Sequence, residues 1–160
     1  MIKLYHGSDT EIVKVDLSHS LYNKDFGKGF YLSDDVEQAW SFARYKAAKP
    51  KSSSKKAIVT EFLFDDRLFT DGSLRVLRFE GYSLEWVSFI KANRRERNKD
   101  YDIVIGPIAN DDVRTQFVKH MLGEITELEL MESLKWKRCT FQYCFISDEA
   151  VSSLKVIGRL

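Results

Sequence analysis

Short strand-like segments and amphipathic helical segments follow one another along this chain in no regular order. Alternating apolar residues, or a short apolar run, predict strands over residues 2–5, 30–33, 57–64, 101–105 and 140–146. Apolar residues three and four apart predict helices over residues 35–46, 83–91, 111–122, 127–136 and 148–154. A regular strand–helix repeat would indicate a parallel sheet, whereas this irregular mixture predicts an α+β domain.

The length of 160 residues fits a single domain spanning residues 1–160, because domains usually contain about 100–200 residues. No internal repeat and no break in composition marks a second domain. A chain of this size buries about 70% of its unfolded surface, so its core needs neither a disulfide nor a metal. The net charge of +1 favours neither nucleic acid nor an anionic membrane as a partner.

The two cysteines, Cys139 and Cys144, lie five residues apart in a strand-like run. An odd separation sends two side chains to opposite faces of a strand, which argues against a disulfide between them. Without further Cys or His at ligand spacing they also make a poor metal site, so we expect no metal. Buried free thiols, the lack of an apolar signal region and the lack of an apolar run of about 18 residues predict a cytoplasmic protein without membrane contact.

The first strand ends at a histidine, a glycine and a serine, which are His6, Gly7 and Ser8. A glycine lets backbone N–H and C=O groups approach a flat ligand closely. His6 on its own is either a structural cap or a ligand contact.

A second segment places two glycines, Gly27 and Gly29, just before an aromatic strand that contains Tyr31. It is not a dinucleotide-binding loop of the Rossmann type, because no strand precedes it and no third glycine opens a helix. Tyr31 either stacks on a ligand close to the backbone or is a core aromatic whose hydroxyl is bonded.

A third segment carries a polar residue, Gln142, on a strand that is otherwise apolar. Gln142 shares one strand face with Cys144, while Phe141, Tyr143 and Phe145 share the other. A buried amide must find hydrogen-bond partners, so Gln142 bonds either backbone or a ligand.

No Walker loop, nucleophile elbow or zinc-protease motif occurs in the sequence. Asp111 and Asp112 stand at a helix start, where capping is the favoured explanation and substrate contact the alternative. The basic clusters at residues 49–56 and 94–99 could meet phosphates, but charge runs are usually solvated surfaces.

The motifs L-Y-H-G-S, then G-K-G-F-Y-L-S before a helix, then F-Q-Y-C-F near the end resemble the ADP-ribosyltransferase superfamily. The similarity is to its diphtheria-toxin/poly(ADP-ribose) polymerase branch, whose three signature strands carry His, Tyr and Glu. The whole chain also resembles a small bacterial family, catalogued as a domain of unknown function, that shares D-F-G-K-G-F-Y, Y-D-I-V-I-G-P-x-A-x-D-D and a late Q-x-x-F strand. Several of its members occur beside a small partner gene in toxin–antitoxin fashion.

The resemblance implies a fold of two small antiparallel sheets splayed around an NAD cleft, with helices packed outside. It implies that His6 bonds a ribose hydroxyl and that Tyr31 stacks on the nicotinamide ring. Gln142 takes the place of the family glutamate. The NAD-contacting residues that it implies are His6, Gly7, Ser8, Gly29, Tyr31 and Ser33.

The function that follows from the resemblance is mono-ADP-ribosyl transfer from NAD to a macromolecular acceptor, a protein or a nucleic acid, with release of nicotinamide. The protein would be the toxin of a toxin–antitoxin pair, and a small antitoxin would be its partner. Because glutamine lacks the charge of glutamate, polymer synthesis is not expected, and Asp111 and Asp112 are candidates for a substitute acid. The alternatives are an inactive module that binds NAD or ADP-ribose, and an interaction domain with a vestigial cleft.

Overall fold

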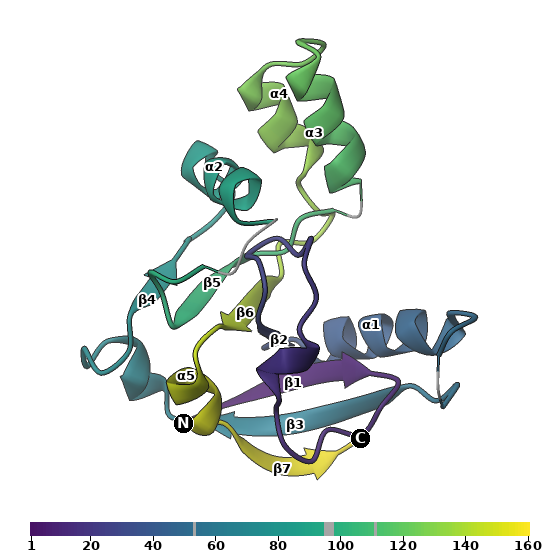
Figure 1. Cartoon of the computed structure of the whole chain (residues 1–160), viewed down its shortest axis with the longest axis vertical. Helices are drawn as coiled ribbons and strands as arrows, with labels where there is room; N and C mark the ends of the chain where they lie inside the picture. Colours follow the sequence, from purple (N-terminus) through teal and green to yellow (C-terminus); the bar gives the residue numbers. More distant parts are fainter. Residues whose placement is uncertain (53, 95–97, 111) are drawn as a thin grey trace.

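The computed structural model describes residues 1–52, 54–94, 98–110 and 112–160. Its strands are β1 Ile2–Ser8, β2 Phe30–Ser33, β3 Ile58–Phe64, β4 Val76–Arg78, β5 Ile103–Pro107, β6 Phe141–Phe145 and β7 Lys155–Arg159. Its α-helices are α1 Val36–Ala48, α2 Leu84–Asn93, α3 Val113–Met121, α4 Glu127–Ser133 and α5 Asp148–Ser152 (Figure 1). Short 3-10 turns lie at Leu17–His19 and Asp66–Phe69.

The seven strands form one mixed sheet in the order β4-β5-β6-β2-β1-β3-β7. β1 pairs with β3 along all seven of its residues, but with β2 it pairs only at Tyr5 and Ser33. The sheet therefore consists of two halves, β4-β5-β6-β2 and β1-β3-β7, that meet in one residue pair. We call this junction the seam.

The α+β class predicted from the sequence is confirmed, but the sheet differs from the expected pair of wholly antiparallel sheets. All strands belong to one sheet, and β4 and β5 run parallel. The reason is the helix α2 between them, since a crossover connection of this kind returns the chain in the same direction.

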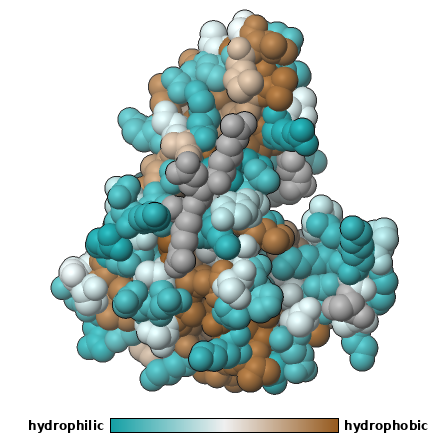
Figure 2. Space-filling view, viewed as in Figure 1, coloured by the Kyte–Doolittle hydropathy of each residue, from teal (hydrophilic) through white to brown (hydrophobic). Residues whose placement is uncertain are grey.

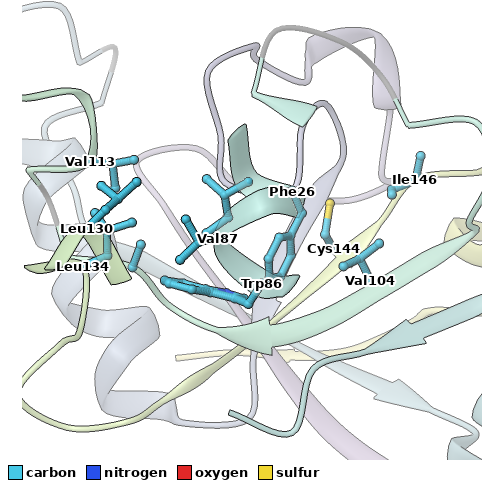
Figure 3. Close-up of a cluster of buried hydrophobic side chains, with 11 residues drawn as sticks. Phe26, Trp86, Val87, Val104, Val113, Leu130, Leu134, Cys144 and Ile146 are labelled. Atoms are coloured by element: carbon cyan, nitrogen blue, oxygen red, sulfur yellow. The ribbon is translucent and has the colours of Figure 1, made fainter. Parts of the chain in front are cut away.

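The hydrophobic core lies on both faces of the sheet. Val104 of β5 and Cys144 of β6 belong to a first cluster, which α2, α3 and α4 cover and in which Trp86 is the largest side chain (Figure 3). Their neighbours Ile103 and Tyr143 belong to a second cluster on the opposite face, which α5 covers with Ala150. This division follows the two-residue period of a strand.

The helix α1 packs separately against β1 and β3, as Figure 1 shows, through the buried side chains of Ala39, Ala43 and Val59. It begins where the sequence predicts, because the side chain of Asp35 accepts hydrogen bonds from the backbone N–H groups of Glu37 and Gln38. The basic loop that follows it is exposed at most of its described positions, as predicted.

All five predicted strands and all five predicted helices are present, with ends shifted by a few residues. The sequence did not reveal β4 and β7. Cys144 is a buried free thiol as expected, but Cys139 is exposed, because it precedes the strand rather than lying in it. None of the helices in the described part of the chain is long and apolar enough to cross a bilayer.

Candidate functional site

The three residues that the sequence singled out lie on neighbouring strands at the seam: His6 on β1, Tyr31 on β2 and Gln142 on β6. Gln142 pairs with Ser33, and Ser33 pairs with Tyr5 in the one residue pair of the ladder between β2 and β1. These paired residues form one row across the three strands. The fold therefore brings together residues from opposite ends of the chain.

The imidazole of His6 bridges the two sides of the seam. Its Nδ1–H donates to the carbonyl oxygen of Tyr31 over 2.7 Å, and its ring stacks on Phe30 with centroids 4.3 Å apart. Burial, together with the nearby charges of Lys46 and Lys24, lowers the pKa of His6 to about 4. The ring is therefore neutral at pH 7, and its Nε2 carries a lone pair that can accept a hydrogen bond.

Tyr31 is held by the loop that precedes its strand. Its hydroxyl donates to the carbonyl oxygen of Gly27 over 2.6 Å and accepts from the N–H of Phe26 over 3.0 Å. Burial raises the pKa of Tyr31 well above its usual value, so the hydroxyl stays protonated. The ring packs against the first core cluster, which confirms the core aromatic with a bonded hydroxyl; stacking on a ligand stays a prediction.

The amide of Gln142 is almost completely buried and has a fixed orientation. Its Nε2 donates to Oδ2 of Asp25 over 3.1 Å and to the carbonyl oxygen of Pro107 over 3.4 Å. The carbonyl of Pro107 is an acceptor and cannot donate, and the same holds for the ionised carboxylate of Asp25. The amide nitrogen of Gln142 must therefore face them, and its Oε1 must face the other way. The partners left open by the sequence are thus a carboxylate and a backbone carbonyl.

Asp25 is the residue of the site that sequence reasoning missed. Its neighbour Phe26 is buried in the first cluster (Figure 3) and anchors the loop, so that the carboxylate lies beside Gln142. Oδ1 of Asp25 pairs with Nη1 of Arg94 over 2.9 Å, and the backbone N–H of Ala109 also donates to the carboxylate. The only signal in the sequence was an acid next to the glycine- and aromatic-rich run at residues 26–31.

The carboxylate of Asp25 is largely buried and forms an ion pair with Arg94. Its side chain is 15% exposed and that of its partner Arg94 is 20% exposed. Burial raises the pKa of Asp25, while the bonds from Gln142 and Arg94 act in the opposite direction. In the basic cluster predicted at residues 94–99, Arg94 is therefore an ion-pair partner, and residues 95–97 lie outside the described residues.

The glycines of the predicted NAD contacts have packing reasons of their own. A Cβ on Gly7 would stand 2.0 Å from the carbonyl oxygen of Ala39, so the glycine lets α1 lie directly on β1. A Cβ on Gly29 would stand 2.5 Å from Sγ of Cys144. Gly7 lies on β1 against α1 and Gly29 precedes β2 and lies against β6, so helix or strand packing alone is sufficient to require both glycines.

The two serines of the predicted set are buried and serve the local backbone. Oγ of Ser8 accepts from the N–H of Thr10 over 3.2 Å. Oγ of Ser33 accepts from the N–H of Asp35 and donates to the carbonyl oxygen of Phe141. Ser33 in this way connects the start of α1 to β6.

Of the two candidate acids at residues 111 and 112, the structure describes only Asp112, which does not lie beside Gln142. Asp111 lies outside the described residues. Asp112 is exposed at the start of α3 and accepts a hydrogen bond from Nε2 of Gln116 over 2.8 Å. The acid beside Gln142 is Asp25 instead.

The described part of the molecule also has cavities away from the seam. One, of about 230 Å³, is lined by Arg75, Asn98, Lys99, Tyr101, Ile146 and Ser147. Another, of about 560 Å³, lies between the loop at residues 13–15, α5 and β7. The surface is also hollowed between the α3–α4 hairpin and α1, as Figure 2 shows, on the side of the molecule where β2 leads into α1.

The family model described as "Protein of unknown function (DUF3990)" matches residues 2–156. The chain belongs to this family. No curated protein matches the chain. The matched segment contains β1, β2 and β6, so the whole seam is part of what the family model describes.

Proposed function

We propose that this protein is an NAD-dependent ADP-ribosyltransferase, which releases nicotinamide and transfers one ADP-ribose unit to a macromolecular acceptor. The observation that carries the proposal is that His6, Tyr31 and Gln142 lie on three neighbouring strands beside the seam, where β1 and β2 part after one residue pair. NAD lies across the seam in this proposal. The motif order on these three strands, which resembles the ADP-ribosyltransferase superfamily, supports it.

The site offers complementary groups for the nicotinamide–ribose part of NAD. The neutral ring of His6 presents Nε2 as an acceptor for a ribose hydroxyl, since its Nδ1–H is bonded to Tyr31. The nicotinamide stacks on the ring of Tyr31, whose hydroxyl is already satisfied by the loop. The backbone of Gly7 holds the carboxamide, with Ser8, Gly29 and Ser33 around it.

Gln142 and Asp25 divide the work that a single glutamate does elsewhere in the superfamily. Because Asp25 and Pro107 hold the amide nitrogen, Oε1 of Gln142 accepts a hydrogen bond from the ribose 2′-hydroxyl. The amide brings no charge of its own. The Asp25 carboxylate, one hydrogen bond behind it, polarises the amide so that Oε1 becomes a stronger acceptor, while Arg94 balances the charge of the carboxylate itself.

The reaction breaks the bond between the ribose C1′ and the nicotinamide nitrogen. Nicotinamide leaves as a neutral molecule with the electron pair, and the ribose gains oxocarbenium character. A nucleophile of the acceptor forms the new bond to C1′ and loses its proton to solvent. With no carboxylate directly on the ribose, the site does not activate weak nucleophiles, so single transfer or NAD hydrolysis fits it better than polymer synthesis.

A second function, an inactive module that binds NAD or ADP-ribose, is favoured by one observation. Gln142 stands where the superfamily has a charged catalytic group, and its amide is bonded to the protein's own carboxylate. Such a module would keep the hydrogen-bonding pattern for the dinucleotide but would not stabilise the charge that develops on the ribose.

The experiment that separates the two functions measures nicotinamide release from NAD together with NAD binding. We expect release by the wild-type protein and a loss of about 10²-fold or more in His6→Ala, as for removal of a transition-state hydrogen bond in a preorganised site. His19→Ala is the matched control, because that histidine side chain is 84% exposed and lies in the loop before β2. Binding without release would establish the module, and the absence of both would overturn the proposal.

The proposal extends to a role as the toxin of a toxin–antitoxin pair, with a small protein as antitoxin. Expression in bacteria then arrests growth, and the arrest requires His6. If the purified wild-type protein releases nicotinamide but its expression in bacteria is harmless, the toxin role is contradicted. The transferase activity would remain in place.

A further inference from the structure

We propose that one side of α1, together with the loop before β2, is a binding surface for single-stranded nucleic acid. The surface consists of Lys24, Phe42, Tyr45, Lys46 and Lys49, and we call it the basic–aromatic surface. The proposal concerns binding alone and does not depend on NAD chemistry. Figure 1 shows that α1 lies beside β1 and β3 at one side of the molecule, and hydrophilic side chains gather there in Figure 2.

Four of the five side chains lie on one side of the helix because of its period. Phe42, Tyr45, Lys46 and Lys49 are three and four residues apart, so they line the same stripe, next to the buried stripe of Ala39 and Ala43. Lys24 reaches the stripe from the loop. The surface thus joins two segments that are separate in the sequence.

Lysines and aromatic rings alternate on this surface. Nζ of Lys24 and Nζ of Lys46 lie 5.3 and 5.0 Å from the ring centroid of Phe42. Nζ of Lys49 lies 4.4 Å from the centroid of Tyr45, and the two rings are 6.2 Å apart. Tyr45 is 60% exposed, which leaves its ring accessible to a stacking partner.

Positive charge predominates on this surface, and the acidic residues Asp25, near Lys24, and Asp9, near Lys46, balance only part of it. No acidic residue occurs between Glu37 and Glu61, a segment that contains six lysines and arginines: Arg44, Lys46, Lys49, Lys51, Lys55 and Lys56.

The lysines also act on one another. Burial and the neighbouring lysines lower the pKa of Lys24 and of Lys46, and the charges that oppose this effect are Asp25 and Asp9. Keeping three cations close together is unfavourable in the free protein. A bound polyanion would relieve that repulsion, which is typical of a phosphate-binding surface.

The combination selects a ligand that has both a phosphate backbone and flat rings. Proteins that bind single-stranded DNA or RNA without sequence preference use a basic groove for the backbone and exposed aromatic side chains on which bases stack. A duplex hides its bases in its own stack, so Tyr45 would have nothing to bind. Neither inorganic polyphosphate nor an anionic membrane offers a base.

The test measures binding of labelled oligonucleotides of about 20 residues, oligo(dT) and oligo(U), to the intact protein without NAD, by fluorescence anisotropy. We expect Lys46→Gln/Lys49→Gln to weaken binding about tenfold and to reduce the slope of log K against log salt by about 1.4, since each phosphate contact contributes about 0.7. Tyr45→Ala, which changes an exposed side chain, should weaken binding about fivefold or more.

The matched control is Lys14→Gln/Lys137→Gln, which removes the same charge from exposed positions outside the surface. It should leave affinity within about twofold, because distant surface charges are screened. The proposal is overturned if the oligonucleotides do not bind, or if control and test variants weaken binding equally. It is also overturned if a duplex, polyphosphate or phosphatidylserine vesicles bind as tightly as the single strand.

Discussion

Single hydrogen bonds determine which atoms the candidate site presents to a ligand. The protonated Nδ1 of His6 is committed to the carbonyl of Tyr31, and the amide nitrogen of Gln142 is committed to Asp25. The remaining faces of both side chains are therefore acceptors. The sequence identified His6 and Gln142, because a histidine and an amide stand out on apolar strands. It did not identify Asp25, because the contact joins residues 117 positions apart and no local pattern reports such a contact.

The first prediction concerns the pair of Asp25 and Gln142 and the effect of moving the carboxylate from residue 25 to residue 142. Gln142→Glu places a second carboxylate against Asp25, whose Oδ2 lies 3.1 Å from Nε2 of Gln142, and ionising both carboxylates at that separation is unfavourable. We expect it to lower the free energy of unfolding by about 2 kcal/mol or more. In the background of Asp25→Asn the same change should cost at least about 1 kcal/mol less, because one donor and one carboxylate then face each other again. Urea unfolding of the four proteins measures this coupling.

Gln116→Glu with Asp112→Asn is the control cycle for this prediction, since Gln116 makes the same kind of bond to Asp112 on the exposed surface of α3. Like charges at an exposed pair of this spacing cost only about 0.5 kcal/mol. If the two cycles gave equal coupling energies, the buried pair would not have the electrostatic importance that we assign to it.

At the scale of helices and strands, what the sequence revealed depended on burial. The alternating run of β3 and the capped start of α1 were predicted because each carries its own pattern. β7 was missed because most of its residues are exposed at the edge of the sheet, so no apolar alternation marks it. β4 was missed because it is three residues long and needs β5 beside it to become a strand.

The contact of α1 with β1 gives the second prediction. Gly7→Ala places a Cβ 2.0 Å from a backbone oxygen of α1, so helix and strand must separate. We expect a loss of about 2–4 kcal/mol in the free energy of unfolding, in the range of overpacked core positions with backbone displacement. Thermal or urea unfolding checks it. Gly81→Ala is the control, because nothing lies within 4 Å of its added Cβ, and it should be neutral or slightly stabilising.

At the scale of the whole molecule, the two halves of the sheet pack into a common core, but their backbones pair at only one position where the halves meet. The second hydrophobic cluster contains Leu4 of β1 as well as Leu32 of β2 and Phe145 of β6, so side chains hold the halves together where backbone pairing does not. The sequence predicted the class of the fold, but it could not show the seam. Pairing between strands distant in sequence is fixed by packing rather than by local pattern.

The neutral histidine in the seam makes the stability of the molecule depend on pH. The pKa of His6 is about 4 in the folded protein and about 6.5 when unfolded, so between these values the unfolded state binds more protons. Stability is therefore fully present above about pH 6.5 and falls as the pH drops toward about 4. We expect His6 to contribute a loss of about 2 kcal/mol between about pH 7 and about pH 5.

This third prediction is checked by urea unfolding of the wild-type protein and of His6→Phe, which keeps a ring against Phe30 but does not titrate. The wild-type protein should lose more stability than the variant over this interval. His19→Ala should behave like the wild-type protein. Parallel curves for all three proteins would contradict the neutral, bridging histidine.

The position of the seam has a mechanical meaning. The unpaired backbone groups of a sheet ordinarily lie along its outer edges. Here the junction with the fewest paired residues runs through the middle of the sheet, at Tyr5 and Ser33. Small rotations of one half against the other therefore break few bonds. A dinucleotide bound across the seam would connect the two halves where backbone pairing is absent and would make the sheet stiffer on both sides. Slower amide exchange would then appear as far away as β3 and β5, in residues that never touch the ligand.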